Sequence, residues 1–195
     1  MIIKKFRSIK SEIRVLGIDD GSFVPQTSGS LDIVGVVYRG GNWFEGLIRS
    51  KVTIDGFDAI EKIASMIKNS PFYGELRIAF LDGISFAGFN VVDINQLSRM
   101  LDMPVISIVR DKPDLEKIKR ALHHLPDFLE RWNAIENAGK LIEVKVRKND
   151  NPIFIQIAGI LLDDAERIIK ITSTHSNIPE ALRVAHIIAS GLTCQ

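Results

Sequence analysis

Cysteine is almost absent from this chain. Cys194 is the one cysteine among 195 residues, so no internal disulfide can form. Nothing in the sequence around Cys194 indicates a catalytic thiol. A single unpaired cysteine is typical of a reducing compartment, and we expect a cytoplasmic protein.

Long apolar runs are also missing. No run approaches the roughly 20 apolar residues that a membrane span needs. The amino-terminal stretch MIIKKFRSIKSEIR is basic, but it lacks the apolar core and the cleavage site of a signal peptide. We therefore expect a soluble protein that is neither secreted nor bound to a membrane.

An excess of charge of one sign is lacking as well. The chain has 25 basic and 24 acidic residues, a formal net charge of +1. Such a balance produces no global field that would attract nucleic acid, so a nucleic-acid partner needs a local patch or bridging metal ions. The G-x-G-x-x-G fingerprint and the P-loop are absent, which makes a small-molecule-binding α/β protein the least favoured class.

The chain does contain alternating strand and helix patterns. Apolar and β-branched runs predict strands over residues 12–20, 31–40, 42–52, 77–81 and 104–110. Gly40-Gly41 predicts a hairpin turn between the second and third strands. Helical spacing of apolar residues predicts helices over residues 57–69 and 94–102, between the later strands. The crossover rule then predicts a mixed five-stranded α/β sheet with the order 3-2-1-4-5.

Further elements follow toward the carboxyl terminus. We expect helices over residues 113–122, 126–138, 161–170 and 178–192, and strands over residues 141–147 and 151–160. No repeat, linker or low-complexity segment interrupts the chain. Its length fits one domain over residues 1–195.

Acidic residues end two of the predicted strands. The first strand ends in Asp19-Asp20 and the fourth in Asp82, and these strands are predicted to be parallel neighbours. Neighbouring strands lie about 5 Å apart, so these carboxylates could share one cation. A third acid, Asp55 or Asp58, can come from the segment IDGFDAIE. Oxygen ligands of this kind suit Mg²⁺ or Mn²⁺ and predict phosphodiester hydrolysis, whereas the alternative roles are turn formation and helix capping.

Several of these stretches resemble a known nuclease family. GIDDGSF, FLDGISFAGFN and PVISIVR resemble motifs of endonuclease V, in the ribonuclease H-like superfamily. The set IDDGSF, IDGFDA, DGISFAGFNVVD and PEALRVAHIIA resembles more closely an uncharacterised archaeal family, domain of unknown function ninety-nine. This second resemblance spans almost the whole chain.

The resemblance implies roles for individual residues. Asp19 and Asp82 match the metal-binding acids, Asp58 is preferred over Asp55 for the middle acid, and Arg110 stands where a phosphate-binding lysine is usual. VTIDG replaces the YVPG wedge that lies beside a damaged base in endonuclease V. We therefore expect little preference for inosine.

The remaining site candidates are less tightly specified. Phe86 and Phe89, on a glycine-rich loop after Asp82, could stack on bases. Asp20 is a further candidate, and the resemblance adds Glu180 and His186, because ribonuclease H-like proteins often contribute a late acid or histidine. His186 lies on the apolar face of its predicted helix, a position that favours a buried core histidine.

The leading hypothesis is a Mg²⁺- or Mn²⁺-dependent nuclease or phosphodiesterase that acts on DNA or RNA. The competing class is a nucleic-acid-binding protein that keeps the fold without catalysis.

Overall fold

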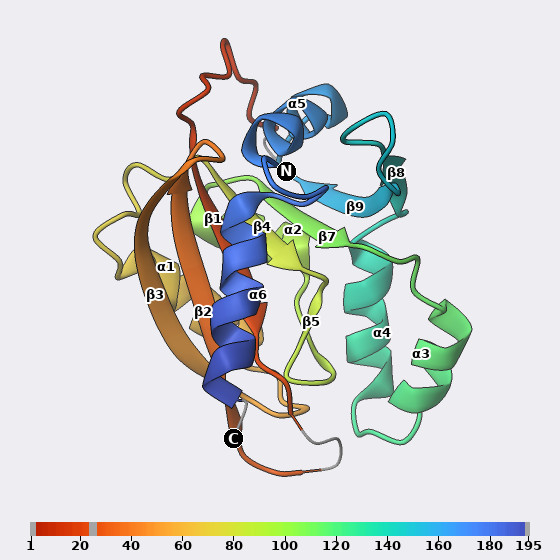
Figure 1. Ribbon diagram of the computed structural model, residues 1–195. Helices are drawn as coiled ribbons and strands as arrows, with labels where there is room; N and C mark the ends of the chain where they lie inside the picture. The colour runs from red at the N-terminus through yellow and green to blue at the C-terminus, as the bar shows by residue number, and fades with distance from the viewer. Residues whose placement is uncertain (1–2, 24–26, 194–195) are drawn as a thin grey trace.

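A mixed seven-stranded sheet forms the centre of the fold in the computed structural model, which describes residues 3–23 and 27–193 (Figure 1). Cys194 lies outside the described residues. The strands follow the order β3-β2-β1-β4-β7-β9-β8. Their bounds are Arg14–Asp20 (β1), Ser30–Arg39 (β2), Trp43–Thr53 (β3), Ile78–Asp82 (β4), Val105–Val109 (β7), Ile142–Val144 (β8) and Ile153–Ala158 (β9).

The strand directions match the predicted fold class. β1, β4 and β7 are parallel, whereas β2, β3, β9 and β8 run antiparallel to their neighbours. The predicted order of five strands is found as β3-β2-β1-β4-β7. The two later strands extend this sheet beyond β7, an arrangement that the sequence did not specify.

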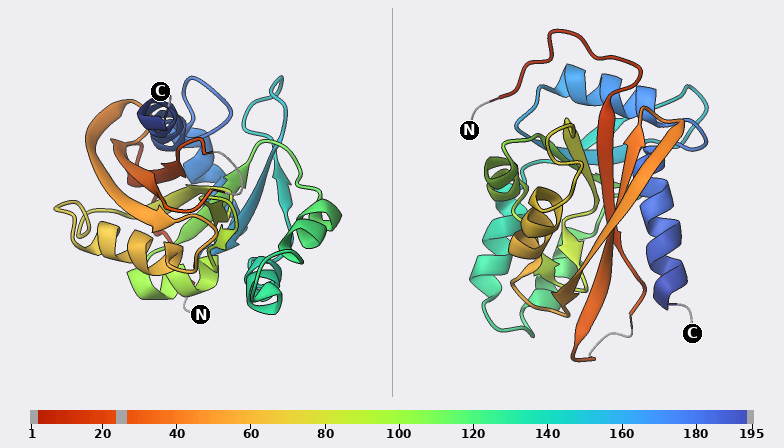
Figure 2. Two further views of the ribbon diagram at one scale, coloured as in Figure 1. Left: turned by 90° about the horizontal axis from the view of Figure 1, so that it is seen from below. Right: turned by 90° about the vertical axis from the view of Figure 1, so that its left-hand side faces the viewer.

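Helices cover both faces of the sheet (Figure 2). Their bounds are Ala59–Lys68 (α1), Ile94–Leu101 (α2), Leu115–Leu122 (α3), Phe128–Asn137 (α4), Leu162–Thr172 (α5) and Glu180–Thr193 (α6). α1 and α2 pack on one face, and α5 and α6 pack on the other. α3 and α4 lie beside the end of β7 that continues into α3 (Figure 1). Within the described part of the chain, no helix is long and apolar enough to cross a membrane.

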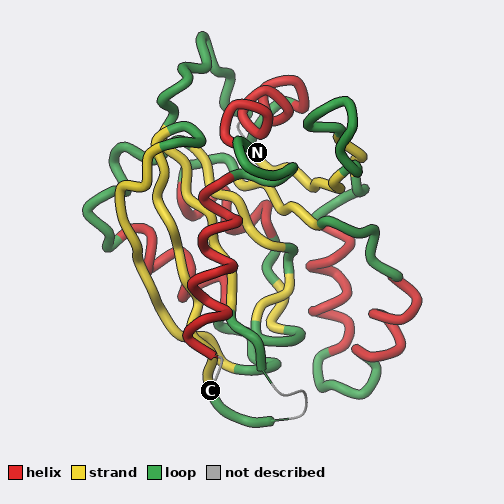
Figure 3. The backbone as a smooth tube through the Cα atoms, viewed as in Figure 1, coloured by secondary structure: helices red, strands yellow, loops and turns green. Residues whose placement is uncertain are grey.

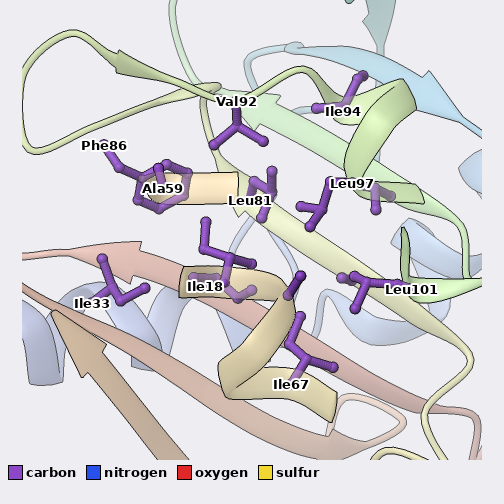
Figure 4. Close-up of a cluster of buried hydrophobic side chains, with 14 of the residues drawn as sticks. Ile18, Ile33, Ala59, Ile67, Leu81, Phe86, Val92, Ile94, Leu97 and Leu101 are labelled. Carbon is purple, nitrogen blue, oxygen red and sulfur yellow. The ribbon is translucent and has the colours of Figure 1, made fainter. Parts of the chain in front are cut away.

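The core on the α1 and α2 face follows from strand alternation. Leu16 and Ile18 of β1 point to this face and belong to its buried cluster. Figure 4 shows Ile18 and Leu81 of β4 in this cluster with Ile67 of α1 and Leu97 of α2. α2 begins where the Asp93 side chain accepts hydrogen bonds from the amides of residues 95 and 96. These caps and alternations position the strand ends that carry the acids.

The structure differs from the predictions in one strand and in one additional hairpin. The strand predicted over residues 141–147 is only Ile142–Val144, because the chain turns from Val146 onward. A small hairpin formed by β5 (Ser85–Phe86) and β6 (Asn90–Val91) was not predicted. Figure 3 shows that much of the segment between β4 and α2 is loop, so its two short strands left little periodicity in the sequence.

Candidate metal centre

Two aspartates meet at the carboxyl ends of β1 and β4. The register pairs Ile18 with Leu81, so Asp19 and Asp82 each follow one residue later on adjacent parallel strands. Both side chains point to the α6 face, because Asp19 and Asp82 are an even number of residues from Val15 and Phe80, which lie in the core on that face. Open α/β sheets build their sites at such strand ends.

His186 of α6 completes this group. Its Nδ1 lies 2.7 Å from Asp19 Oδ2 and 3.8 Å from Asp82 Oδ2. One possible ligand atom from each of Asp19, Asp82 and His186 lies within 4.8 Å of the others, and no other trio in the described ranges does so. The expectation that His186 is a buried core residue is wrong: its side chain is 48% exposed, because this part of α6 extends past the strand ends to the site.

The electrostatics of the group favour a bound cation. Burial, with the nearby negative charge of Asp82, raises the pKa of Asp19 to about 9. The Asp19 residue is only 4% exposed, so water cannot screen the two like charges. A cation bound between the two carboxylates would relieve this repulsion. The two carboxylates are donors that suit Mg²⁺ and Mn²⁺, so they fit such an ion, and His186 adds a nitrogen donor beside them.

Arg110 supplies positive charge at the edge of the group. Its guanidinium Nη1 lies 3.7 Å from Asp82 Oδ2, and its side chain is 45% exposed. Arg110 follows β7, the strand next to β4, so it reaches the same edge of the sheet. An exposed guanidinium at this place can bind a phosphate oxygen.

Asp20 fixes a loop beside the site. Its Oδ2 accepts a hydrogen bond from the backbone amide of Ala87, in the turn of the β5–β6 hairpin. Burial raises the pKa of Asp20. The structure thus places Asp20 next to the group, with one carboxylate oxygen engaged by the hairpin.

Asp55 and Asp58 lie in the turn between β3 and α1, and neither belongs to the group. Asp58 accepts hydrogen bonds from the amide and hydroxyl of Thr53 and from the Asn90 side chain. Burial raises the pKa of Asp58, but these hydrogen bonds outweigh that effect and lower it. Asp55 Oδ1 accepts the amide of Phe89 at 2.8 Å. The structure therefore gives both acids local structural partners.

The remaining candidates have different environments. Phe86 is fully buried in the core, where no base can reach its ring, whereas Phe89 is only partly buried. Glu180 is also buried and pairs with Arg183 at 2.7 Å. Burial raises the pKa of Glu180, but this pair and the His175 amide outweigh that effect and lower it. Phe86 and Glu180 thus fill structural positions on either side of the sheet.

Arg131 of α4 is a structural residue that sequence reasoning missed. It is 2% exposed and donates to the carbonyl groups of Asp55, Gly56, Phe89 and Pro126. Its guanidinium also packs over the Phe57 ring, 3.9 Å from the centroid. Arg131 joins α4 to the turn before α1 and to the hairpin beside the site. No sequence signal distinguishes this arginine from an exposed one.

Comparison with known proteins places this geometry in a family. The model of the family described as endonuclease dU matches residues 11–193. The chain is 53% identical over 184 residues to a UPF0215 protein of Methanosarcina acetivorans, covering 94% of this chain and 92% of that protein.

Solved structures share the fold. A protein of unknown function from Archaeoglobus fulgidus has a TM-score of 0.82 at 35% identity, covering 92% of this chain and 97% of that one. Endonuclease V of Ciona intestinalis was solved with a 24mer DNA containing an inosine followed by a ribo-adenosine. It has a TM-score of 0.57 at 16% identity, and the match covers 88% of this chain and 82% of that one. The predicted ribonuclease H-like fold class is confirmed through this endonuclease V likeness.

Proposed function

The chain belongs to the endonuclease dU family, and from this premise we propose that it is a divalent-metal-dependent endonuclease that cuts DNA at deoxyuridine. The observation that carries the proposal is the convergence of Asp19, Asp82 and His186 at the ends of two parallel strands. This donor set suits a hard divalent cation.

Each residue of the site has a role in this proposal. Asp19, Asp82 and His186 hold Mg²⁺ or Mn²⁺, and Arg110 binds a phosphate oxygen of the scissile strand. The bound ion supplies an activated water and stabilises the charge that develops on the phosphate. Asp20 holds the β5–β6 hairpin against the site, and the partly buried Phe89 lies on that hairpin.

The substrate follows from the family description and not from the sequence motifs. Absence of the YVPG wedge predicts little preference for inosine, yet the family description points to deoxyuridine, another deaminated nucleoside. We propose that the chain reads deoxyuridine with residues other than a wedge. An endonuclease V that shares the fold was solved with DNA, which supports DNA as the substrate class.

A cleavage panel tests the proposal. Strands of one sequence carry deoxyuridine, deoxyinosine, deoxycytidine or thymidine at one position, with RNA counterparts, and are incubated in Mg²⁺, Mn²⁺ or chelator. We expect cutting of the deoxyuridine strand only with metal, and its loss in Asp19→Asn and Asp82→Asn. Asp163→Asn, an exposed acid on α5, is the matched control.

Two outcomes would contradict the proposal. Cutting that persists in chelator, or in Asp82→Asn, would remove the metal centre from the mechanism. Absence of cutting, combined with salt-sensitive binding of all strands, would instead establish the non-catalytic binding protein.

A further inference from the structure

A cavity of about 770 Å³ opens beside the candidate metal centre. Gly83, Ile84 and Ser85, which directly follow Asp82, line one end of it. Val109, which directly precedes Arg110, lines it as well. The cavity therefore begins where the two strands that carry Asp82 and Arg110 end.

Two buried polar side chains face this cavity. Ser107 of β7 and Gln156 of β9 are cross-strand partners, 2% and 7% exposed, and both line the cavity. Gln156 Nε2 donates to the Gly139 carbonyl at 2.7 Å. Across residues 3–23 and 27–193, neither the Ser107 hydroxyl nor Gln156 Oε1 has a protein hydrogen-bond partner, and neither atom is sealed from the cavity. Because both atoms reach the cavity, a ligand bound there could form a hydrogen bond with each of them.

The chemistry of Gln156 defines what it can recognise. Only the amide nitrogen can donate to the Gly139 carbonyl, so Oε1 is held as a hydrogen-bond acceptor. If Gln156 Oε1 faces ring position 3 of a pyrimidine, it accepts from N3–H of uracil and is repelled by N3 of cytosine, which is itself an acceptor. Deamination of cytosine therefore creates a donor at the ring position that Gln156 would face.

We propose that this cavity binds the extruded uracil base, with Gln156 Oε1 accepting its N3–H and the Ser107 hydroxyl donating to a ring carbonyl. This inference rests on the proposed function and deepens it, because it names the two residues that determine specificity. Thymine has the same N3–H, but in duplex DNA it pairs with adenine. Uracil formed by deamination faces guanine, and a mismatched base is easier to extrude.

The walls of the cavity suit the faces of a base. Trp132, Ile118 and Ile135 give apolar surface, and the Trp132 indole is held by its 2.8 Å hydrogen bond to Glu136. Apolar walls of this kind favour burial of a heterocyclic ring. Lys112 and Lys140 also line the cavity and can bind the phosphates on either side of the base.

The sheet connects the cavity to the metal centre. Alternation places Ser107 on the α1 and α2 face, with Val105, and Asp82 on the α6 face, with Phe80. Gly83, at φ 74°, turns the chain directly after Asp82, and the residues that follow line the cavity. A nucleotide bound at this edge thus places its base on one face and leaves its phosphate toward the acids on the other.

A single atom of the substrate tests the proposal. Single strands with deoxyuridine, N3-methyl-deoxyuridine or deoxycytidine at one position are compared, because single strands remove any effect of base pairing. For the wild type we expect kcat/KM for deoxyuridine to exceed the values for the other two by about 10- to 100-fold. Gln156→Met, which keeps the side-chain length, should cut all three at similar rates, and Ser107→Ala should weaken the preference partially.

The controls separate this inference from the proposed function. Gln96→Met changes an exposed glutamine of α2 outside this cavity and should keep the wild-type preference. Unchanged Mn²⁺ affinity of Gln156→Met shows that the variant is folded with an intact metal centre. Equilibrium binding of the same strands without metal gives a second readout that does not need cutting.

The outcomes are distinct. If the wild type cuts nothing but binds deoxyuridine more tightly through Gln156, the inference stands and the nuclease proposal fails. If the wild type cuts or binds N3-methyl-deoxyuridine as well as deoxyuridine, or if Gln156→Met keeps the preference, the inference is overturned.

Discussion

At the scale of single residues, Asp19 has the environment least compatible with an isolated carboxylate. It is buried beside Asp82, and its Oδ2 lies 2.7 Å from the His186 imidazole. Its Oδ1 accepts the amide of Asp20. A buried acid with these neighbours is stabilised by a proton, by a protonated His186 or by a bound cation, so its state depends on pH and metal.

The first prediction concerns the pH dependence of metal-free stability. The folded pKa of Asp19, about 9, exceeds its unfolded value of roughly 4, so the folded state binds the extra proton in between. The contribution of this proton to the free energy of unfolding is complete below about pH 4 and is lost as the pH rises toward 9. With chelator present, the melting temperature of the wild type should fall from pH 5 to pH 8. The melting temperature of Asp19→Asn should fall less over the same range. Equal slopes would contradict the assigned burial.

The second prediction concerns metal affinity. Asp82→Asn removes one ligand charge while nearly keeping the side-chain shape, so calorimetric Mn²⁺ affinity should fall by about 10-fold or more. Because burial and Asp82 raise the pKa of Asp19, metal binding at pH 7 should also release a proton, which would appear as a dependence of the binding enthalpy on the buffer ionisation enthalpy. Asp163→Asn should match the wild type. Unchanged affinity in Asp82→Asn would exclude this residue as a ligand.

Residues at strand ends could be found from sequence, whereas buried polar residues could not be assigned. Asp19 and Asp82 were predicted because each ends an apolar run and the crossover rule makes those runs neighbours. Ser107 and Gln156 left only a weak signal, a single polar letter inside the runs VISIV and IFIQIA. Their significance depends on a cavity formed by α3, α4 and β9, which no local pattern specifies.

At the scale of elements, α6 is positioned by its close approach to β1. A Cβ added at Gly17 would lie 2.3 Å from backbone atoms of Ala181 and Leu182. The absence of a side chain at Gly17 therefore lets the helix backbone rest on the strand. This contact sets the distance of α6 from β1 and therefore the position of His186, which follows Leu182 by about one helical turn.

The third prediction tests this contact. Gly17→Ala should move α6 away from β1 and reduce the free energy of unfolding by about 3 kcal/mol. Mn²⁺ affinity should fall as well, because His186 moves with the helix. Gly191→Ala is the control within α6, since no heavy atom lies within 4 Å of the added Cβ, and alanine should stabilise the helix by about 0.5–1 kcal/mol. Equal stability of the two variants would contradict the packing argument.

The β5–β6 hairpin is the second element that borders the site. Asp20 and Asp55 accept the amides of Ala87 and Phe89, and Arg131 binds the Phe89 carbonyl. The hairpin is therefore held at its turn by three charged side chains from three different parts of the chain.

The fourth prediction concerns removal of the buried guanidinium of Arg131. Arg131→Met leaves several partly buried carbonyl groups without these donors and should lower the free energy of unfolding by about 3 kcal/mol. Arg120→Met, on the exposed side of α3, should change it by less than about 0.5 kcal/mol. Urea denaturation of both variants measures the difference. A loss in Arg131→Met no larger than in Arg120→Met would mean that the hairpin does not depend on Arg131.

Elements with strong periodicity were predictable, and those formed by tertiary contacts were not. The central strands and α1, α2, α5 and α6 occur where apolar spacing predicted them. β8 is shorter than predicted, because one partner strand at the sheet edge supports only residues 142–144. The β5–β6 hairpin depends on Asp20, Asp55 and Arg131, which lie far from it in sequence, so local propensity could not reveal it.

At the scale of the whole molecule, two sites share one edge of a single sheet. The carboxyl ends of β1 and β4 present the acids toward α6, and the ends of β4 and β7 border the cavity on the opposite face. The net charge of +1 leaves long-range attraction weak. Under the proposed function, affinity for a DNA strand would therefore come from local contacts, namely a bound cation, Arg110 and the lysines that line the cavity.

A divalent cation held jointly by Asp19, Asp82 and His186 should be visible by anomalous diffraction from crystals soaked in Mn²⁺. We expect a strong peak bounded by the two carboxylates and the imidazole, about 2.0–2.3 Å from its ligand atoms, and its loss in Asp82→Asn. Absence of a peak there at saturating Mn²⁺, with the three side chains ordered, would exclude a metal centre formed by these residues.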